Sequence, residues 1–195
     1  MNYIKRNLEN VVNQAAKEYP VVLVTGPRQV GKTTMLQKLM EGTDREYVTL
    51  DDLNERSIAK NDPELFLQLH KPPVLVDEVQ YAPELFSYIK MYVDKNHEPG
   101  SFWLTGSQVF KLMRGVQESL AGRVAVLSLT SLSQAEICGG NMEPFTIDME
   151  SLAARKHERE ETDTRGIFER IYRGSMPAIV SGANSNPQIF YSSRS

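Results

Sequence analysis

Residues 21–33 read VVLVTGPRQVGKT, an apolar run followed by a loop that is bounded by glycines and ends in lysine and threonine. The apolar run is short and rich in valine, which is typical of a buried strand in a parallel sheet covered on both faces. Gly26 to Thr33 matches the pattern GxxxxGK[ST] at every fixed position. Residues 32–40 are predicted to form a helix directly after it. Strand, loop and helix in this order are the context that the motif requires.

This loop is predicted to hold the phosphates of a nucleotide. Its backbone N–H groups converge on the phosphates, and the positive end of the following helix points toward them. The Lys32 ammonium reaches the β- and γ-phosphates, and the Thr33 hydroxyl is a ligand of Mg²⁺. A surface turn that holds Lys-Thr by chance is the alternative, and it leaves the flanking strand and helix unexplained. The predicted nucleotide contacts are Gly26, Pro27, Arg28, Gln29, Val30, Gly31, Lys32, Thr33 and Thr34.

A second acidic site is predicted in residues 74–78, VLVDE, where an apolar strand ends in two carboxylates. An Asp at the end of this strand completes the magnesium shell in P-loop folds, so Asp77 is predicted to be a metal ligand beside Thr33. Glu78 then acts on the water that attacks the γ-phosphate, as a general base or as the acceptor that orients it. Acidic residues also end ordinary solvated strands. The complete phosphate loop upstream favours the functional interpretation.

Small polar residues follow the next strand, in residues 102–108, FWLTGSQ. Ligands bind at the carboxyl edge of such sheets, so a side chain here can hydrogen-bond the γ-phosphate or the attacking water. Ser107 is the first candidate for this sensing and catalytic role, with Thr105 and Gln108 behind it. The alternative is that Ser107 only caps the next helix.

Two arginines are candidates for stabilising charge on the transferring phosphoryl group. Arg28 lies inside the loop. Arg123 follows the segment ESLAG and opens the last predicted core strand. Surface arginines are common, so a purely structural role stays open for each.

Further strands are predicted at residues 47–50, 74–76, 102–104 and 124–129, each separated from the next by helical sequence. Strands that alternate with helices imply right-handed crossovers and a parallel sheet, so the predicted fold class is α/β, a three-layer sandwich with a five-stranded parallel sheet. The signal decays from about residue 141. No Asn-Lys-x-Asp segment that would read guanine is found, which favours ATP over GTP.

The bulk composition excludes several classes of protein. The net charge of −3 gives no global attraction to nucleic acid, although the 22 Lys and Arg residues could still cluster locally. The single cysteine, Cys138, excludes an internal disulfide framework. No apolar run approaches the roughly 20 residues that cross a bilayer, and the charged N-terminus does not resemble a signal peptide. We therefore expect a soluble, cytoplasmic protein with no membrane partner.

Four segments together, GPRQVGKTT, VLVDEVQ, LTGSQ and ESLAGRV, resemble the AAA+-related prokaryotic ATPases that pair an AAA-type domain with a C-terminal domain of unknown function. The resemblance implies a strand order of 5-1-4-3-2 and an ATPase domain at residues 1–140. It implies that residues 141–195 form a helical extension or linker toward a C-terminal domain that this chain lacks. It also implies self-association through AAA-type contacts, in which Arg123 completes a neighbour's site, and DNA as a partner through that C-terminal region.

The predicted function is magnesium-dependent binding and hydrolysis of ATP, which would drive or gate a partner domain. The main alternative is a switch that binds ATP without hydrolysing it and organises an interaction surface, for instance on DNA. Glu78 discriminates between the two, because a pure switch has no need to activate water. A small-molecule phosphotransferase is the third interpretation, and the sequence offers no evident mobile lid for a second substrate.

Overall fold

The structure is a computed structural model, and it describes residues 3–107, 112, 115–116, 118–140, 146–157, 163–184 and 186–192. The chain divides into two compact units. The first unit is Leu8–Thr130, and the second unit joins Met1–Asn7 to Ser131–Ser195. The predicted domains, residues 1–140 and 141–195, stay a prediction.

The first unit is built on a parallel sheet of five strands in the order β2-β3-β4-β1-β5. This is the predicted order read from the opposite edge, so both the fold class and the strand order are confirmed. The strands are β1 (Val21–Thr25), β2 (Glu46–Thr49), β3 (Val74–Asp77), β4 (Phe102–Gly106) and β5 (Val124–Ser128).

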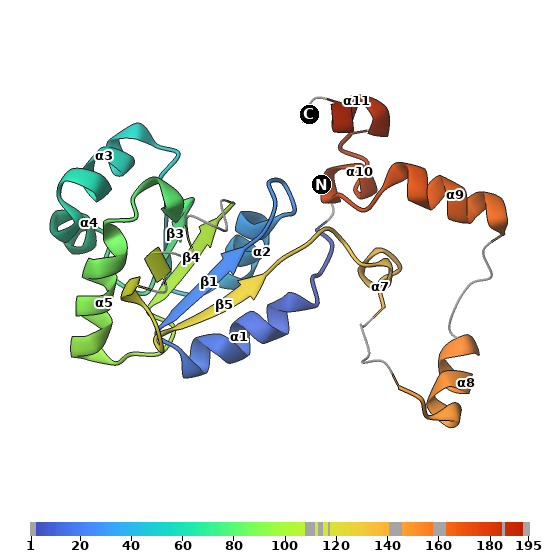
Figure 1. Ribbon diagram of the computed structural model, residues 1–195, viewed down its shortest axis with the longest axis horizontal. Coiled ribbons are helices and arrows are strands. Elements are labelled where there is room, and N and C mark those ends of the chain that lie inside the picture. Colours follow the sequence, from blue (N-terminus) through green and yellow to red (C-terminus); the bar gives the residue numbers. More distant parts are fainter. Residues whose placement is uncertain are drawn as a thin grey trace. The chain divides into compact units, whose positions relative to one another are not determined.

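Helices follow the strands in the alternation that the sequence predicts (Figure 1). The stretch after β2 contains two helices, because Asp62 ends one and caps the next, whose first residue is Pro63. Among the described residues, the helical elements with defined bounds in the first unit are α1 (Leu8–Glu18), α2 (Lys32–Met40), α3 (Leu53–Asn61), α4 (Pro63–Leu69), the 3₁₀ turn η1 (Val79–Tyr81) and α5 (Leu85–Asn96).

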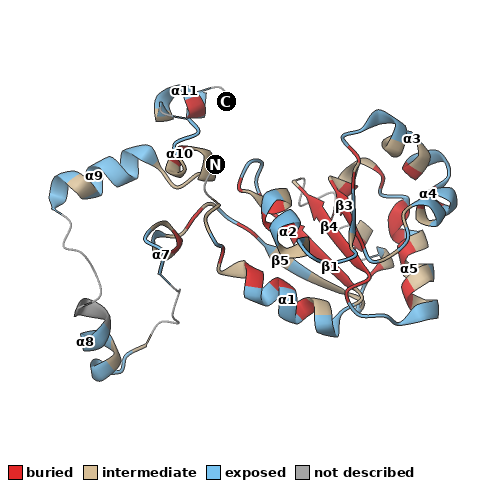
Figure 2. Ribbon diagram, turned by 180° about the vertical axis from the view of Figure 1, so that it is seen from behind, coloured by how far each residue is buried: buried red, intermediate tan, exposed pale blue. Residues whose placement is uncertain are grey.

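The three central strands, β3, β4 and β1, are buried along their whole length, as Figure 2 shows in red. Alternate residues of a strand point to opposite faces, so the two faces can be separated by parity. Val21 and Leu23 belong to the same apolar cluster as Phe66 of α4 and Ile89 of α5. The intervening strand residues are equally buried, and α1 contacts β1 and α2. Continuous apolar runs are thus explained by helices on both sides of the sheet.

The second unit contains short helices around a small core. Among the residues of this unit that the structure describes, the buried apolar side chains are Leu132, Ile179 and Phe190. Arg6 and Glu136 form a buried ion pair, with 3.1 Å between Nε and Oε1. Within the residues that the structure describes, no helix is long and apolar enough to cross a bilayer. The helices are α7 (Gln134–Ile137), α8 (Met149–His157), α9 (Thr164–Arg173), α10 (Pro177–Val180) and α11 (Pro187–Ser192).

Candidate phosphate-binding site

The loop between β1 and α2 has backbone angles that its glycines make accessible. Gly26 has φ of 142°, and a Cβ there would lie 2.0 Å from the carbonyl oxygen of Leu129. Gly31, directly before α2, has φ of 92°. Gln29 adopts φ of 64° without being glycine. Positive φ at a bulky residue is uncommon and recurs at functional sites, so the loop conformation is a specific one.

Lys32 is buried within this loop although it carries a charge. Its side chain donates hydrogen bonds from Nζ to the carbonyl oxygens of Gly26, at 3.0 Å, and Pro27, at 2.9 Å. Burial lowers the pKa of Lys32, and the nearby charges of Glu78 and Asp77 oppose that shift. A buried ammonium needs such partners, because desolvation of an unpaired charge is costly. The loop therefore fixes a cation beside its own backbone.

Asp77, the last residue of β3, accepts hydrogen bonds from three hydroxyl groups. The Thr33 hydroxyl donates to Oδ1 at 2.7 Å, and the Thr105 hydroxyl at the end of β4 donates to the same oxygen. The Tyr47 hydroxyl donates to Oδ2 at 3.2 Å. Burial and the charge of Asp77 together raise the pKa of Tyr47, so this phenol keeps its proton and remains a donor.

Glu78 lies immediately after the strand and has φ of 57°. Its side chain accepts hydrogen bonds at Oε2 from Gln80 and, at 3.4 Å, from Ser107. Its backbone N–H donates to the Thr105 hydroxyl at 3.2 Å. Thr105 thus connects both acidic residues to the end of β4, and the strand-end residues form one hydrogen-bonded network.

These contacts bring the predicted phosphate loop, acidic pair and strand-end polar residues together at the carboxyl edge of the sheet. Arg28 and Thr34 are exposed beside the loop, and Val30 is packed in the core. Ser107 contacts Glu78, and Gln108 lies outside the described residues.

Arg123 is not brought to this edge. It precedes β5 and therefore lies at the amino edge of the parallel sheet, away from the phosphate loop. Its guanidinium binds the Asp94 carboxylate through two nitrogens, one of them at 3.1 Å. The Arg123 hydrogen bond and charge lower the pKa of Asp94, and the same pairing raises the pKa of Arg123. The structure shows a structural contact for this residue within its own chain.

Two members of the network were missed by the sequence analysis, Tyr47 and Gln80. Tyr47 is on β2, the neighbouring strand of Asp77, and strand alternation places it on the same face. Which of several polar residues reaches across a strand pair depends on side-chain length and sheet twist, so only the structure identifies it.

Residues 18–138 match the protein family described as AAA domain. The chain belongs to the AAA domain family. An uncharacterized protein of Mycobacterium tuberculosis is 34% identical over 134 residues, which cover 68% of this chain and 30% of that protein, and an uncharacterized protein of Mycobacterium bovis matches equally. The chain thus spans about 30% of the length of these curated relatives.

Three solved structures share the fold of this AAA domain. The Walker-type ATPase of Pyrococcus abyssi superposes with a TM-score of 0.59 at 16% identity, over 95% of this chain and 69% of that one. AMPPCP-bound DnaA from Aquifex aeolicus gives a TM-score of 0.55 at 15% identity, over 93% and 61% of the two chains. The RuvB Holliday junction branch migration motor of Thermotoga maritima gives 0.52 at 15% identity, over 89% and 58%. The fold is therefore that of an AAA+-related P-loop ATPase.

The residues at the sheet edge fit a magnesium ion. Thr33 supplies a hydroxyl oxygen and Asp77 a carboxylate oxygen, 2.7 Å apart. Mg²⁺ prefers oxygen ligands, retains several waters and is held by few protein groups together with substrate phosphates. Across the described part of the chain, no group of three or more His, Cys, Asp or Glu residues could form an all-protein metal cage. The donor set is therefore appropriate for a nucleotide-bound magnesium.

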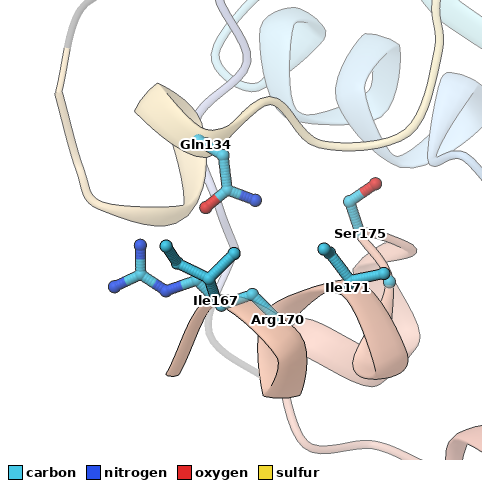
Figure 3. Close-up of a pocket in the computed structure, with 6 residues that line it drawn as sticks. Gln134, Ile167, Arg170, Ile171 and Ser175 are labelled. Atoms are coloured by element: carbon cyan, nitrogen blue, oxygen red, sulfur yellow. The ribbon is translucent and has the colours of Figure 1, made fainter. Parts of the chain in front are cut away.

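A separate pocket of about 420 Å³ lies in the second unit and contains no predicted site residue. Figure 3 shows Ile167 and Ile171 of α9 rising toward Gln134 and Ser175. Its other lining residues are Arg170 and Gly174. The pocket has no acidic pair and no activated nucleophile among these residues, so it does not compete with the sheet edge as a site of chemistry.

Proposed function

We propose that this AAA domain binds ATP with Mg²⁺ and hydrolyses it. One observation carries the proposal: the Thr33 hydroxyl of the phosphate loop donates a hydrogen bond to Asp77 at 2.7 Å. The neighbouring Lys32 is buried, and the charges of Glu78 and Asp77 oppose the lowering of its pKa by burial. Positioning and charge stabilisation are nearly all that a protein must supply for phosphoryl transfer. Loop, cation and acidic pair at one edge are the parts that this chemistry needs.

Each residue has a defined part in the proposed reaction. The loop N–H groups and Lys32 bind the phosphates, and Lys32 exchanges its bonds to the Gly26 and Pro27 carbonyls for phosphate oxygens. Thr33 and Asp77 hold the magnesium, which when bound neutralises charge on the phosphates. Glu78 accepts the proton of the attacking water. Ser107 and Gln80 restrain the Glu78 carboxylate while it does so.

A non-catalytic ATP switch is the second candidate. The observation in its favour is that one carboxylate oxygen of Glu78 is already hydrogen-bonded to both Gln80 and Ser107. Two donors that occupy this oxygen leave it less accessible to the proton of an attacking water. In that case nucleotide binding rearranges the network around Thr105 and no water is activated.

The partners of the domain are part of the proposal. We propose self-association in which Arg123 acts on a neighbouring copy, and DNA as a second partner. RuvB, whose fold is similar, is a Holliday junction branch migration motor. Turnover measured with and without duplex DNA tests the second partner.

The central test is nucleotide binding by Lys32→Ala, followed with a fluorescent ATP analogue. Loss of the ammonium removes the main side-chain charge opposite the phosphates, so we expect affinity to fall on the order of 100-fold with the fold intact. Lys38→Ala is the matched control, because Lys38 lies on the same helix and pairs with Glu41 at the surface. Wild-type affinity in Lys32→Ala would overturn the proposed function.

A further inference from the structure

The hydroxyl of Tyr47 reaches the acidic site from β2, a strand that contains none of the nucleotide-binding motifs. Its partner in the β2–β3 register is Leu75, two residues before Asp77. A diagonal neighbour in a sheet is within reach of an aromatic side chain, and here the phenol spans that diagonal to Oδ2 of Asp77 at 3.2 Å. The tyrosine is therefore long enough to act at the strand end from a position below it.

The two oxygens of Asp77 have different partners. Oδ1 faces the phosphate loop and accepts from Thr33, as well as from Thr105. Oδ2 faces β2 and accepts from Tyr47. A carboxylate with a fixed donor on each oxygen cannot rotate freely about its terminal torsion, which is otherwise broad. The Tyr47 bond thus selects the orientation in which Oδ1 points to the loop.

Burial of Asp77 makes the loss of the Tyr47 hydrogen bond costly. Asp77 is 5% exposed, and a buried carboxylate needs its hydrogen bonds. Tyr47 is 37% exposed, so its ring lies at the rim of the site. Replacement by phenylalanine keeps the ring and removes only the donor.

We propose that Tyr47 is a positioning residue, whose hydroxyl orients the Asp77 carboxylate for magnesium. The inference rests on the proposed function. Partners that orient a metal ligand commonly contribute 10- to 100-fold in metal affinity when they are removed. Tyr47 therefore sets the magnesium requirement of nucleotide binding and leaves the metal-independent contacts of the phosphate loop unchanged.

A purely structural role makes a different prediction. β2 is an edge strand, and the Tyr47 bond could simply fasten it to β3. Its loss would then lower stability, and it would weaken nucleotide binding equally with and without magnesium. The dependence on magnesium separates the two roles.

The experiment measures binding of a fluorescent ATP analogue to wild type and Tyr47→Phe, in EDTA and across a MgCl₂ titration. We expect the MgCl₂ concentration at half-maximal tightening to rise about 10-fold, with the affinity in EDTA unchanged within about twofold. Tyr92→Phe is the matched control, since Tyr92 packs edge-on against Phe102 at 5.4 Å and removal of its hydroxyl leaves the acidic site intact. Thermal unfolding of both variants checks that each is folded.

Two results would overturn the inference while the proposed function stands. One is a magnesium midpoint in Tyr47→Phe within about twofold of wild type, and the other is an equal loss of affinity in EDTA and in MgCl₂. Failure of the proposed function has another signature: wild type itself does not bind the analogue, or binds it no better with magnesium than in EDTA.

Discussion

The two units of the chain are stabilised in different ways. In the first unit, the strand residues Leu23, Val76 and Leu104 are fully buried in one apolar cluster, and Val22 and Val24 are equally buried on the other face of the sheet. In the second unit, α9 has no buried residue, and Phe168 and Ile171 are 67% and 70% exposed. A rigid, close-packed sheet suits a site whose contacts must be held to fractions of an ångström. An exposed apolar helix face marks a surface suited to contacts with other segments or partners.

In the second unit, a buried carboxylate organises a set of polar contacts. The Glu136 side chain accepts hydrogen bonds from Arg6 and from the backbone N–H groups of Asn7, at 2.8 Å, and Ser133, at 2.7 Å. Burial would raise the pKa of Glu136, but these donors and the Arg6 charge hold it below its usual range. One buried carboxylate thus ties the N-terminal residues to α7. The comparison suggests that chemistry belongs to the first unit and adaptable contacts to the second.

The largest expected effect tests whether one copy of the first unit contains every residue that ATP hydrolysis needs. Arg123 lies in this unit but at the edge opposite the phosphate loop, so a catalytic role for Arg123 would have to be in the site of another copy. We expect specific ATPase activity to rise with protein concentration, and Arg123→Ala to remove that rise while nucleotide binding stays intact. An arginine supplied in trans contributes on the order of 10³-fold or more in rate.

Asp94→Asn is the matched control for Arg123→Ala, because it breaks the same ion pair and leaves the arginine in place. If the trans role holds, Asp94→Asn retains the rise in activity with concentration. Activity that is independent of concentration, with similar small losses of stability in both variants, would contradict it and support the structural role. Mixing Arg123→Ala with Glu78→Gln subunits should also restore part of the activity.

The next effect distinguishes catalysis from switching within the first unit. Glu78→Gln keeps the shape of the side chain and removes the acceptor for the water proton, so turnover should fall by about 10²–10⁴ while magnesium-ATP binding is retained. Glu84→Gln, an exposed change in the turn before α5, serves as the control. Unchanged turnover would assign the base to another residue. Absence of turnover in wild type with every partner tried would favour the switch.

A third prediction tests the difference in packing directly. Leu104→Ala should cost about 2–5 kcal/mol in the free energy of unfolding, because it leaves a cavity beneath α5 in the middle of the sheet. Ile171→Ala, on the exposed face of α9, should stay within about 0.5 kcal/mol. Urea unfolding followed by the fluorescence of Trp103, the single tryptophan, measures the first change, and hydrogen exchange of α9 peptides measures the second. Equal effects of the two changes would show that α9 is covered in solution.

The sheet and the phosphate loop could be predicted from the sequence because their signals are local. VVLV, GPRQVGKT and VLVDE each combine an apolar strand with the residues that follow it, and the structure places those residues at one edge. Among contacts between segments distant in the chain, the motifs predicted the approach of Thr33 to Asp77, 44 residues apart, but not the side-chain pairings outside the motifs. Tyr47 reaches Asp77 over 30 residues, and Arg123 finds Asp94 across 29. Such pairings depend on sheet register and side-chain length, which no short motif encodes.

The second unit was the least predictable part for a related reason. Its core is small, and the Arg6–Glu136 pair joins residues 130 positions apart. The amphipathic spacing of α9 indicates a helix, but its apolar face is exposed in the structure. Hydrophobic periodicity is therefore consistent with the helix but does not identify what covers its apolar face.

The smallest expected effect uses pH to separate the units. His70 lies between two carboxylates, with Nδ1 at 2.6 Å from Glu46 and Nε2 at 2.8 Å from Glu55, and Phe66 packs beside the ring. Both nitrogens donate only in the protonated ring, so although burial lowers the pKa of His70, its bonds to Glu46 and Glu55 raise it overall. A raised folded pKa gives stability that is complete below about pH 6.5 and is lost as pH rises through the folded value.

The contribution of Glu136 to stability depends on pH in the opposite direction. Its lowered pKa gives stability that is present above about pH 4.3 and is lost as pH falls through the folded value.

Hydrogen exchange read peptide by peptide at about pH 5 and pH 8 tests both residues, with exchange rates corrected for intrinsic pH dependence. His70→Gln should weaken protection of α3 and α4 by about 1 kcal/mol at the lower pH and by less at the higher pH, because one neutral hydrogen bond is all that wild type keeps there. Glu136→Gln should weaken α7 at both values, since its carboxylate is ionised throughout this range. If His70→Gln acts equally at both pH values, the imidazole is not held in its charged form. If it also alters protection of α7, the two units do not respond to pH as separate bodies.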